Sequence, residues 1–166
     1  MARALGETTI TISVLDRLID HEPENKAENL LSRTQSLRLV KAAVRRDLEW
    51  LLNSRRIVAP PDENLKELNK SAYIYGLPDL SSLTMATAAD RNRLMRQIVG
   101  TINLFEPRLS NVRMVMIETE NSGKKDVRLR IDAMLRLDPV PEPISFDSVI
   151  ELKSGNCHLS GGDDAR

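Results

Sequence analysis

The chain has 166 residues, of which 24 are basic, 24 are acidic and 41% are apolar. This length and composition predict one folded domain with a core of its own. The balanced charge argues against nonspecific nucleic-acid binding, which needs a basic excess. One tryptophan, two tyrosines and two phenylalanines are too few for a base-stacking surface.

The chain carries no recognisable targeting or membrane segment. Residues 1–9 lack the apolar core of a signal peptide, and no apolar run approaches the roughly 20 residues that span a bilayer. Cys157 is the only cysteine, so no internal disulfide can form. We therefore expect a cytosolic protein without membrane insertion.

A short amphipathic helix is predicted near the N-terminus, over residues 13–20. Ser13 and Asp16 have the spacing of a capping box. A helix this short is marginal alone and must dock on the rest of the domain. The polar stretch that follows, about residues 21–33, reads as a surface loop.

The strongest helical pattern begins at Thr34 or Ser36 and runs to Asn53. Apolar residues recur at spacings of three and four, which indicates one buried face: Leu37, Val40, Val44, Leu48 and Leu51. Lys41 is placed on the charged outer face. Trp50 is expected to pack in the core, as a lone tryptophan beside an apolar stripe usually does.

The middle of the chain is broken by prolines and glycines. After Pro60 and Pro61, residues 65–71 predict a weak single helical turn. Residues 72–79 read as a short extended piece that closes in a turn at Gly76 and Pro78.

A second long helix is predicted from Ala88 to Phe105, with Thr87 and Asp90 as a capping box. Its buried stripe comprises Leu94, Ile98, Ile102 and Phe105. Gly100 lies inside this helix and costs about 1 kcal/mol relative to alanine. It either allows another backbone to approach closely or is merely tolerated.

The helix ends in Phe105-Glu106-Pro107-Arg108-Leu109, which is the corner between the helical half and the β half of the chain. Pro107 ends the helix and pushes Glu106 into extended backbone. Glu106 and Arg108 are then displayed at a stiff corner. They form either a local ion pair or a two-pronged contact for a partner, and the residues alone favour the ion pair.

Three strands are predicted after the corner, over residues 112–120, 126–138 and 145–153. The second strand alternates strictly, with Val127, Leu129, Ile131, Ala133, Leu135 and Leu137 on one face. Arg128 and Arg130 are expected to pair with Asp147 and Glu151 on the next strand. The tail from 155 to 166 reads as disordered.

The predicted fold class is α+β. Two main helices plus a short N-terminal helix pack on a small antiparallel three-strand meander, in one domain spanning residues 1–154. The meander has exposed edges, which favours an assembly role in which a partner strand adds to the sheet.

The residues suggest no catalytic chemistry. No carboxylate pair stands out, and the only histidines are His21 and His158, without a second ligand pair near Cys157. Phosphate-binding loops and nucleophile elbows are absent from the sequence. We expect no catalytic, cofactor or metal site.

Five segments in this order resemble the TssE family of type VI secretion baseplate subunits, part of a larger family of gene-25-like phage baseplate wedge proteins once labelled lysozyme-like. The segments are Ser13-Val-Leu-Asp-Arg-Leu, Leu48-Glu-Trp-Leu-Leu-Asn, Tyr75-Gly-Leu-Pro-Asp, Phe105-Glu-Pro-Arg-Leu and Arg130-Ile-Asp-Ala-Met-Leu. The resemblance covers nearly the whole chain, except the N-terminal loop and the C-terminal tail.

The resemblance implies a non-enzymatic structural role in a contractile apparatus. Glu106, Pro107 and Arg108, flanked by Phe105 and Leu109, would contact the wedge partners TssF and TssG, and TssK is a further expected partner. The subunit would also template assembly of the TssB/TssC sheath, at the cytoplasmic face of the inner membrane. This reverses the preference for a purely local ion pair. Two alternatives stay open: a peptidoglycan hydrolase, and the equivalent subunit of a phage-like tail.

Overall fold

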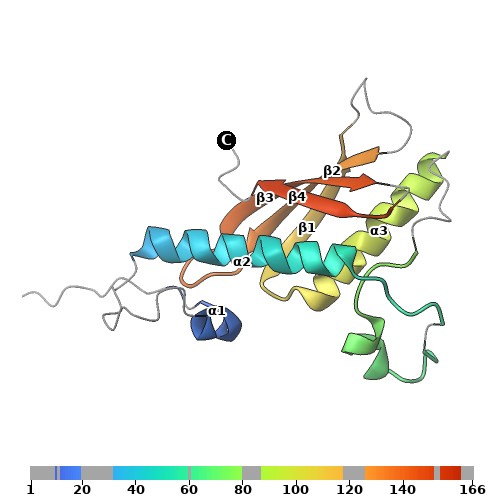
Figure 1. The fold of residues 1–166 in the computed structure, drawn as a ribbon, viewed down its shortest axis with the longest axis horizontal. Coiled ribbons are helices and arrows are strands. Elements are labelled where there is room, and N and C mark those ends of the chain that lie inside the picture. The colour runs from blue at the N-terminus through green and yellow to red at the C-terminus, as the bar shows by residue number, and fades with distance from the viewer. Residues whose placement is uncertain are drawn as a thin grey trace, which may run out of the picture.

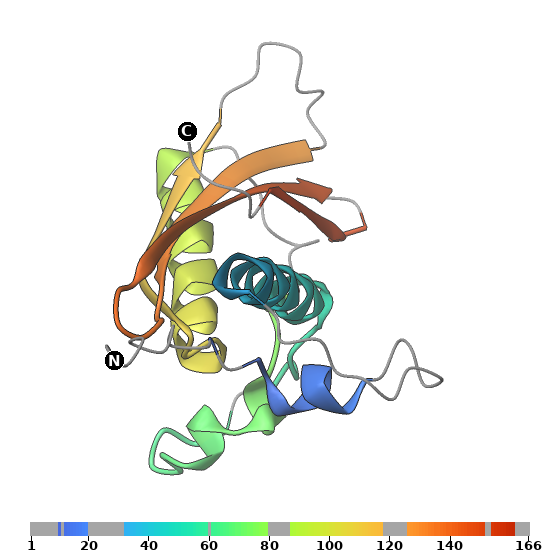
Figure 2. The same ribbon diagram turned by 90° about the vertical axis from the view of Figure 1, so that its left-hand side faces the viewer.

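The computed structural model describes residues 10, 12–19, 32–59, 61–79, 87–117, 126–151 and 154–161, and these form an α+β fold (Figure 1). Helices α2 and α3 lie against one face of an antiparallel sheet, and α1 lies on the side of α2 that faces away from the sheet (Figure 2). The elements in chain order are α1 (Val14–Leu18), α2 (Arg33–Asn53), η1 (Leu68–Lys70), η2 (Ala72–Ile74), α3 (Ala88–Phe105), β1 (Leu109–Met116), β2 (Asp126–Leu135), β3 (Glu142–Glu151) and β4 (Cys157–Gly161).

The sheet has four strands in the order β1-β2-β3-β4, so the predicted three-strand meander is one strand short. The missed strand lies in the segment predicted to be disordered, and that prediction is wrong for residues 157–161. Cys157 and Leu159 alternate into the core at 1% and 9% exposure, and this burial stabilises the short strand. Gly155, with φ of 69°, lies in the turn that leads into it. The core therefore extends beyond the predicted domain boundary at 154, while residues 162–166 lie outside the described residues.

The β1 strand begins at Leu109, three residues earlier than predicted, and residues 118–120 lie outside the described residues. Its ladder with β2 shifts register between Ser110 and Arg113, where Asn111 has φ of 53°. A bulge of this kind adds a residue and bends the strand. The strand thus starts directly at the corner and curves away from it.

The alternation predicted for β2 is confirmed, because Val127, Leu129, Ile131, Ala133 and Leu135 are all buried. The strand ends at Leu135, three residues before the predicted end, and Leu137 packs against the core only in part. Arg130 lies opposite Asp147 and bonds it at 2.8 Å, as predicted. Arg128 instead lies opposite Val149 in the register.

The α2 helix begins at Arg33, because Ser32 and Gln35 form a capping box at its start. The predicted starts at Thr34 and Ser36 come too late, because the capping pair of Ser32 and Gln35 makes Arg33 the first helical residue. Of the predicted stripe, Leu37 is partly buried and the other four residues are buried: Val40, Val44, Leu48 and Leu51.

Two predictions about α2 are wrong. Lys41 is only 6% exposed, because it lies seven positions before Leu48 and hence on the core side of the helix. Trp50 is 55% exposed and does not pack in the core. It lies on the outer face, where the Arg46 guanidinium carbon stands 5.2 Å from the ring centroid.

The segment after α2 returns to the end of that helix. Two short 3-10 turns in it, η1 and η2, occupy residues 68–70 and 72–74, so the extended piece predicted from residue 72 begins only at Tyr75. Leu77 is fully buried, donates its N–H to Ser54 at 2.9 Å, and accepts from Arg56 at 3.0 Å. Gly76 has φ of 103°, and a Cβ there would clash with the Ser54 main chain.

The α3 helix has its predicted bounds and its predicted capping box of Thr87 and Asp90. Leu94, Ile98 and Ile102 are buried, and together with the α2 stripe they cover the inner face of the sheet. A Cβ on Gly100 would meet open space. Close approach of another backbone is therefore not the reason for this glycine.

Candidate partner-binding site at the helix-to-strand corner

The corner between α3 and β1 has the predicted backbone course. Glu106 is the C-cap of α3, with φ of −120° and ψ of 78°, and its N–H still donates to the Ile102 carbonyl at 2.8 Å. Pro107 is exposed, and Leu109 begins β1 with only 3% exposure. The chain therefore turns within two residues and returns at once to the core.

Glu106 and Arg108 form an ion pair across this turn. Glu106 Oε1 accepts from Arg108 Nε at 2.6 Å, and Glu106 Oε2 accepts from Arg108 Nη2 at 2.5 Å. The Arg108 main-chain N–H also donates to Oε1, at 3.3 Å. The Glu106 side chain is only 6% exposed and the Arg108 side chain is 30% exposed. Glu106 is thus not displayed on the surface, contrary to the sequence prediction, while Arg108 partly is.

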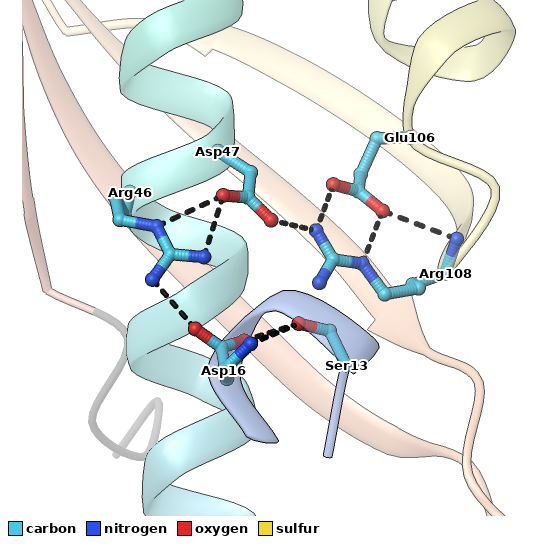
Figure 3. Close-up of polar contacts among 6 residues, drawn as sticks. All are labelled: Ser13, Asp16, Arg46, Asp47, Glu106 and Arg108. Atoms are coloured by element: carbon cyan, nitrogen blue, oxygen red, sulfur yellow. Dashed lines mark hydrogen bonds and ion pairs between the residues drawn. The ribbon is translucent and has the colours of Figure 1, made fainter. Parts of the chain in front are cut away.

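The third member of the site is Asp47 on α2, which the sequence analysis missed. Arg108 Nη2 donates to Asp47 Oδ2 at 2.6 Å, so one nitrogen serves two carboxylates (Figure 3). These bonds, first that with Glu106 and then that with Asp47, raise the pKa of Arg108 above its usual range. One signal could have pointed to Asp47: it is an acid beside the buried stripe, directly before Leu48.

The network continues from Asp47 to the N-terminal helix. Arg46 donates from Nε and Nη2 to Asp47 Oδ1, both at 3.0 Å, and from Nη1 to Asp16 Oδ1 at 2.6 Å (Figure 3). The hydrogen bond from Arg46 lowers the pKa of Asp16 below its usual value. None of the residues of α1 is buried. The contacts that hold α1 against the rest of the domain are therefore mainly polar.

The predicted capping box of α1 is present only in part. Ser13 Oγ accepts from the Asp16 main-chain N–H at 3.2 Å, and the Ser13 hydroxyl donates to Asp16 Oδ2 at 2.5 Å. The Asp16 carboxylate is thus shared between its own helix cap and Arg46 of α2. Because Asp16 bonds both Ser13 and Arg46, the side of α1 that carries Asp16 faces α2.

A pocket of about 310 Å³ opens beside the corner. Tyr75 and Phe105 meet edge to face in its wall, with ring centroids 5.2 Å apart. Burial, and then the charges of Asp47 and Glu106, raise the pKa of Tyr75. The lining residues are Ser13, Asp47, Leu51, Tyr75, Phe105, Glu106, Pro107 and Arg108.

Four of the five predicted site residues thus line one pocket: Phe105, Glu106, Pro107 and Arg108. Leu109 does not, since it is buried at the start of β1. Over the described ranges, no cluster of three or more metal-ligating side chains occurs. Likewise, no described helix is long and apolar enough to cross a membrane. Of the three charged side chains that line the pocket, Arg108 is the most exposed, at 30% against 28% for Asp47 and 6% for Glu106.

Comparison with known protein families gives a match that covers most of the chain. A family model described as "Baseplate wedge protein gp25" matches residues 38–140, more than half of the chain, and the match includes the whole corner. No curated protein matches significantly. Among solved structures, a chain from "The baseplate complex from the type VI secretion system" aligns with a TM-score of 0.47 and 18% identity. The alignment covers 69% of this chain and 97% of that one.

The family match defines the class of the protein: a structural component of a baseplate. Within that class, the chain belongs to the family of baseplate wedge protein gp25, since the family model covers α2 from residue 38 onward, all of α3 and the first two strands.

Proposed function

We propose that this protein is a non-enzymatic subunit of a type VI secretion baseplate that docks on the wedge subunits TssF and TssG through its helix-to-strand corner. Membership of the baseplate wedge family carries the proposal, because the matched residues include the corner and every residue that lines its pocket except Ser13. TssK and the sheath proteins TssB and TssC are the further partners. The baseplate lies at the cytoplasmic face of the inner membrane.

Pre-organisation of the corner supports this role. Arg108 is held by Glu106 and Asp47, so a partner meets a side chain that has already lost its rotamer freedom. Pro107 holds the backbone beside it with a restricted φ. A rigid, partly exposed arginine next to an apolar pocket is typical of an interface hot spot.

The sheath-assembly part of the proposal rests on the sheet edges. Strand β4 has only five residues, and β1 is bent by its bulge, so the two edges differ in what they offer a partner strand. On the edge of β4, Cys157 is already bonded to Asn53 through both main-chain groups. The edge of β1 is therefore the better site for strand addition.

The hydrolase alternative requires two carboxylates that flank a cleft and remain available to a substrate. In the corner pocket the carboxylates are Asp47 and Glu106, and both accept hydrogen bonds from Arg108. This arrangement favours a binding site. The phage-like tail remains a second assignment for the same fold, which the neighbouring genes distinguish.

Co-purification with TssF and TssG tests the docking site. Arg108→Ala and Pro107→Gly should each reduce recovery of the complex while the isolated chain keeps its helical circular dichroism. Arg130→Ala is the matched control, because Arg130 also forms an arginine–aspartate pair but lies on β2, outside the pocket. Normal recovery with folded Arg108→Ala and Pro107→Gly chains would contradict docking through the corner.

A further inference from the structure

Within the described part of the chain, one nitrogen of the Arg108 guanidinium takes part in no hydrogen bond. Nε donates to Glu106, and Nη2 donates to both Glu106 and Asp47. Among the described residues Nη1 has no hydrogen-bond partner, and Figure 3 shows it without a contact to the other residues drawn. Arg108 lines the pocket and keeps 30% of its side chain exposed. Nη1 is therefore an available pair of N–H donors beside the pocket.

Asp47 sets the direction of those donors. Glu106 alone holds Nε and Nη2 in the plane of its own carboxylate, and Asp47 adds a bond of 2.6 Å to Nη2 from a different element. Asp47 is in turn held by two bonds from Arg46, both at 3.0 Å. A guanidinium fixed from two sides presents its remaining nitrogen in one orientation.

The charge of the network decides which acceptor suits Nη1. Three carboxylates, those of Asp16, Asp47 and Glu106, face two guanidiniums, those of Arg46 and Arg108, so the network carries one net negative charge. A partner carboxylate would bring the ratio to four acids against two bases in a partly buried site, which is unfavourable. A neutral oxygen accepts from Nη1 without that repulsion.

The side chains that line the pocket also favour a neutral group of the partner. Leu51, Tyr75, Phe105 and Pro107 give the pocket apolar and aromatic surface beside the donor. A main-chain carbonyl at the end of a partner helix, next to an apolar side chain, satisfies both features, because the last carbonyls of a helix lack intrahelical partners.

We propose that the pocket receives a neutral segment of the wedge partner, whose carbonyl or amide oxygen accepts from Arg108 Nη1, and that Asp47 is the positioning residue for this contact. The inference rests on the proposed docking function and deepens it. It assigns a role to Asp47, on α2, in presenting the corner arginine.

The test measures affinity for a purified TssF–TssG complex and the order of the guanidinium in the free chain. Asp47→Asn keeps the size of the side chain and removes its charge. We expect about tenfold weaker binding, together with collapse of the separate Arg108 Nη1 and Nη2 NMR signals into an averaged signal. Arg108→Lys should also lose at least tenfold, because an ammonium lacks the planar fork.

Asp147→Asn is the matched control, since it removes an aspartate from the exposed Arg130 pair and should leave both readouts unchanged. Asp47→Ser serves in place of Asp47→Asn if the latter does not fold. Equal or tighter binding by the Asp47 variants, with Arg108→Lys still impaired, would overturn this inference and leave the docking function intact. Wild-type affinity in Arg108→Lys and Arg108→Ala would instead overturn the docking function itself.

Discussion

The side-chain amide of Asn53 pairs with both main-chain groups of Cys157. Asn53 Nδ2 donates to the Cys157 carbonyl at 2.8 Å, and the Cys157 N–H donates to Asn53 Oδ1 at 2.8 Å. The last residue of α2 thus occupies the outer edge of β4 as a neighbouring strand would. This pairing explains how a five-residue edge strand is held, and it partly covers an edge that would otherwise be open.

Asn53→Ala should therefore destabilise the fold by about 2 kcal/mol, because two hydrogen bonds of about 1 kcal/mol each are lost. Urea denaturation measures this change, and hydrogen exchange should show faster exchange in β4 than in β2. His158→Ala is the control, since that side chain is 73% exposed. A loss of stability in Asn53→Ala no greater than in His158→Ala would contradict the bridging role.

Removal of Arg108 should destabilise the chain more than neutralisation of Glu106. Arg108→Ala leaves the buried Glu106 carboxylate without its cation, and breaking a buried pair costs about 3 kcal/mol. Glu106→Gln leaves Arg108 with Asp47 and with solvent, so we expect a smaller loss. Thermal and urea unfolding of the two variants measure the difference. A larger loss of stability in Glu106→Gln than in Arg108→Ala would show that the buried Glu106 carboxylate does not need Arg108 as its counter-charge.

Gly100→Ala should stabilise the protein by about 1 kcal/mol. The site lies within α3, a Cβ there meets open space, and alanine has the higher helix propensity. Gly76→Ala is the contrasting variant, because its φ of 103° and the nearby Ser54 main chain both oppose a Cβ, so it should lose stability. The midpoints of urea unfolding give both signs, and destabilisation by Gly100→Ala would reveal a packing role for this surface.

Acid should release α1 before it unfolds the core. The hydrogen bond from Arg46 lowers the pKa of Asp16 below its ordinary value, so the contribution of this carboxylate to stability is complete above about pH 4. It is lost as the pH falls through the lowered pKa, because protonation removes the ion pair with Arg46. NMR signals of residues 13–18 should shift in that range while those of the buried β2 residues do not. Asp16→Asn should abolish this step, and a step that persists would have to come from another group.

Much of the fold could be predicted from local pattern. The bounds of α3, its capping box and the alternation of β2 follow from residue spacing alone. In α3, apolar residues recur with the helical period and Thr87 and Asp90 mark the start, and in β2 apolar residues alternate over ten positions. The strand β4 could not be predicted this way. It has only five residues, and its stability comes from Asn53, more than 100 positions away, and from burial of Cys157 and Leu159.

The site was predicted only in part, because some of its residues are neighbours in the sequence and others meet only in the fold. Pro107 marks the corner in the sequence, and the charges at 106 and 108 are adjacent to it. Asp47 lies 61 positions from Arg108, and only the packing of α2 against the corner brings them together. Trp50 was misplaced because its neighbours Leu51 and Leu52 are core residues, whereas the helix turns Trp50 itself to the outer face.

The tryptophan on that outer face has a practical consequence. The sequence contains no other tryptophan, and its ring lies under the guanidinium that bridges Asp16 and Asp47. Its intrinsic fluorescence therefore comes from a single environment, one residue away from the contact between the first two helices. Emission from the unlabelled protein can follow that contact in real time as the subunit joins a larger assembly.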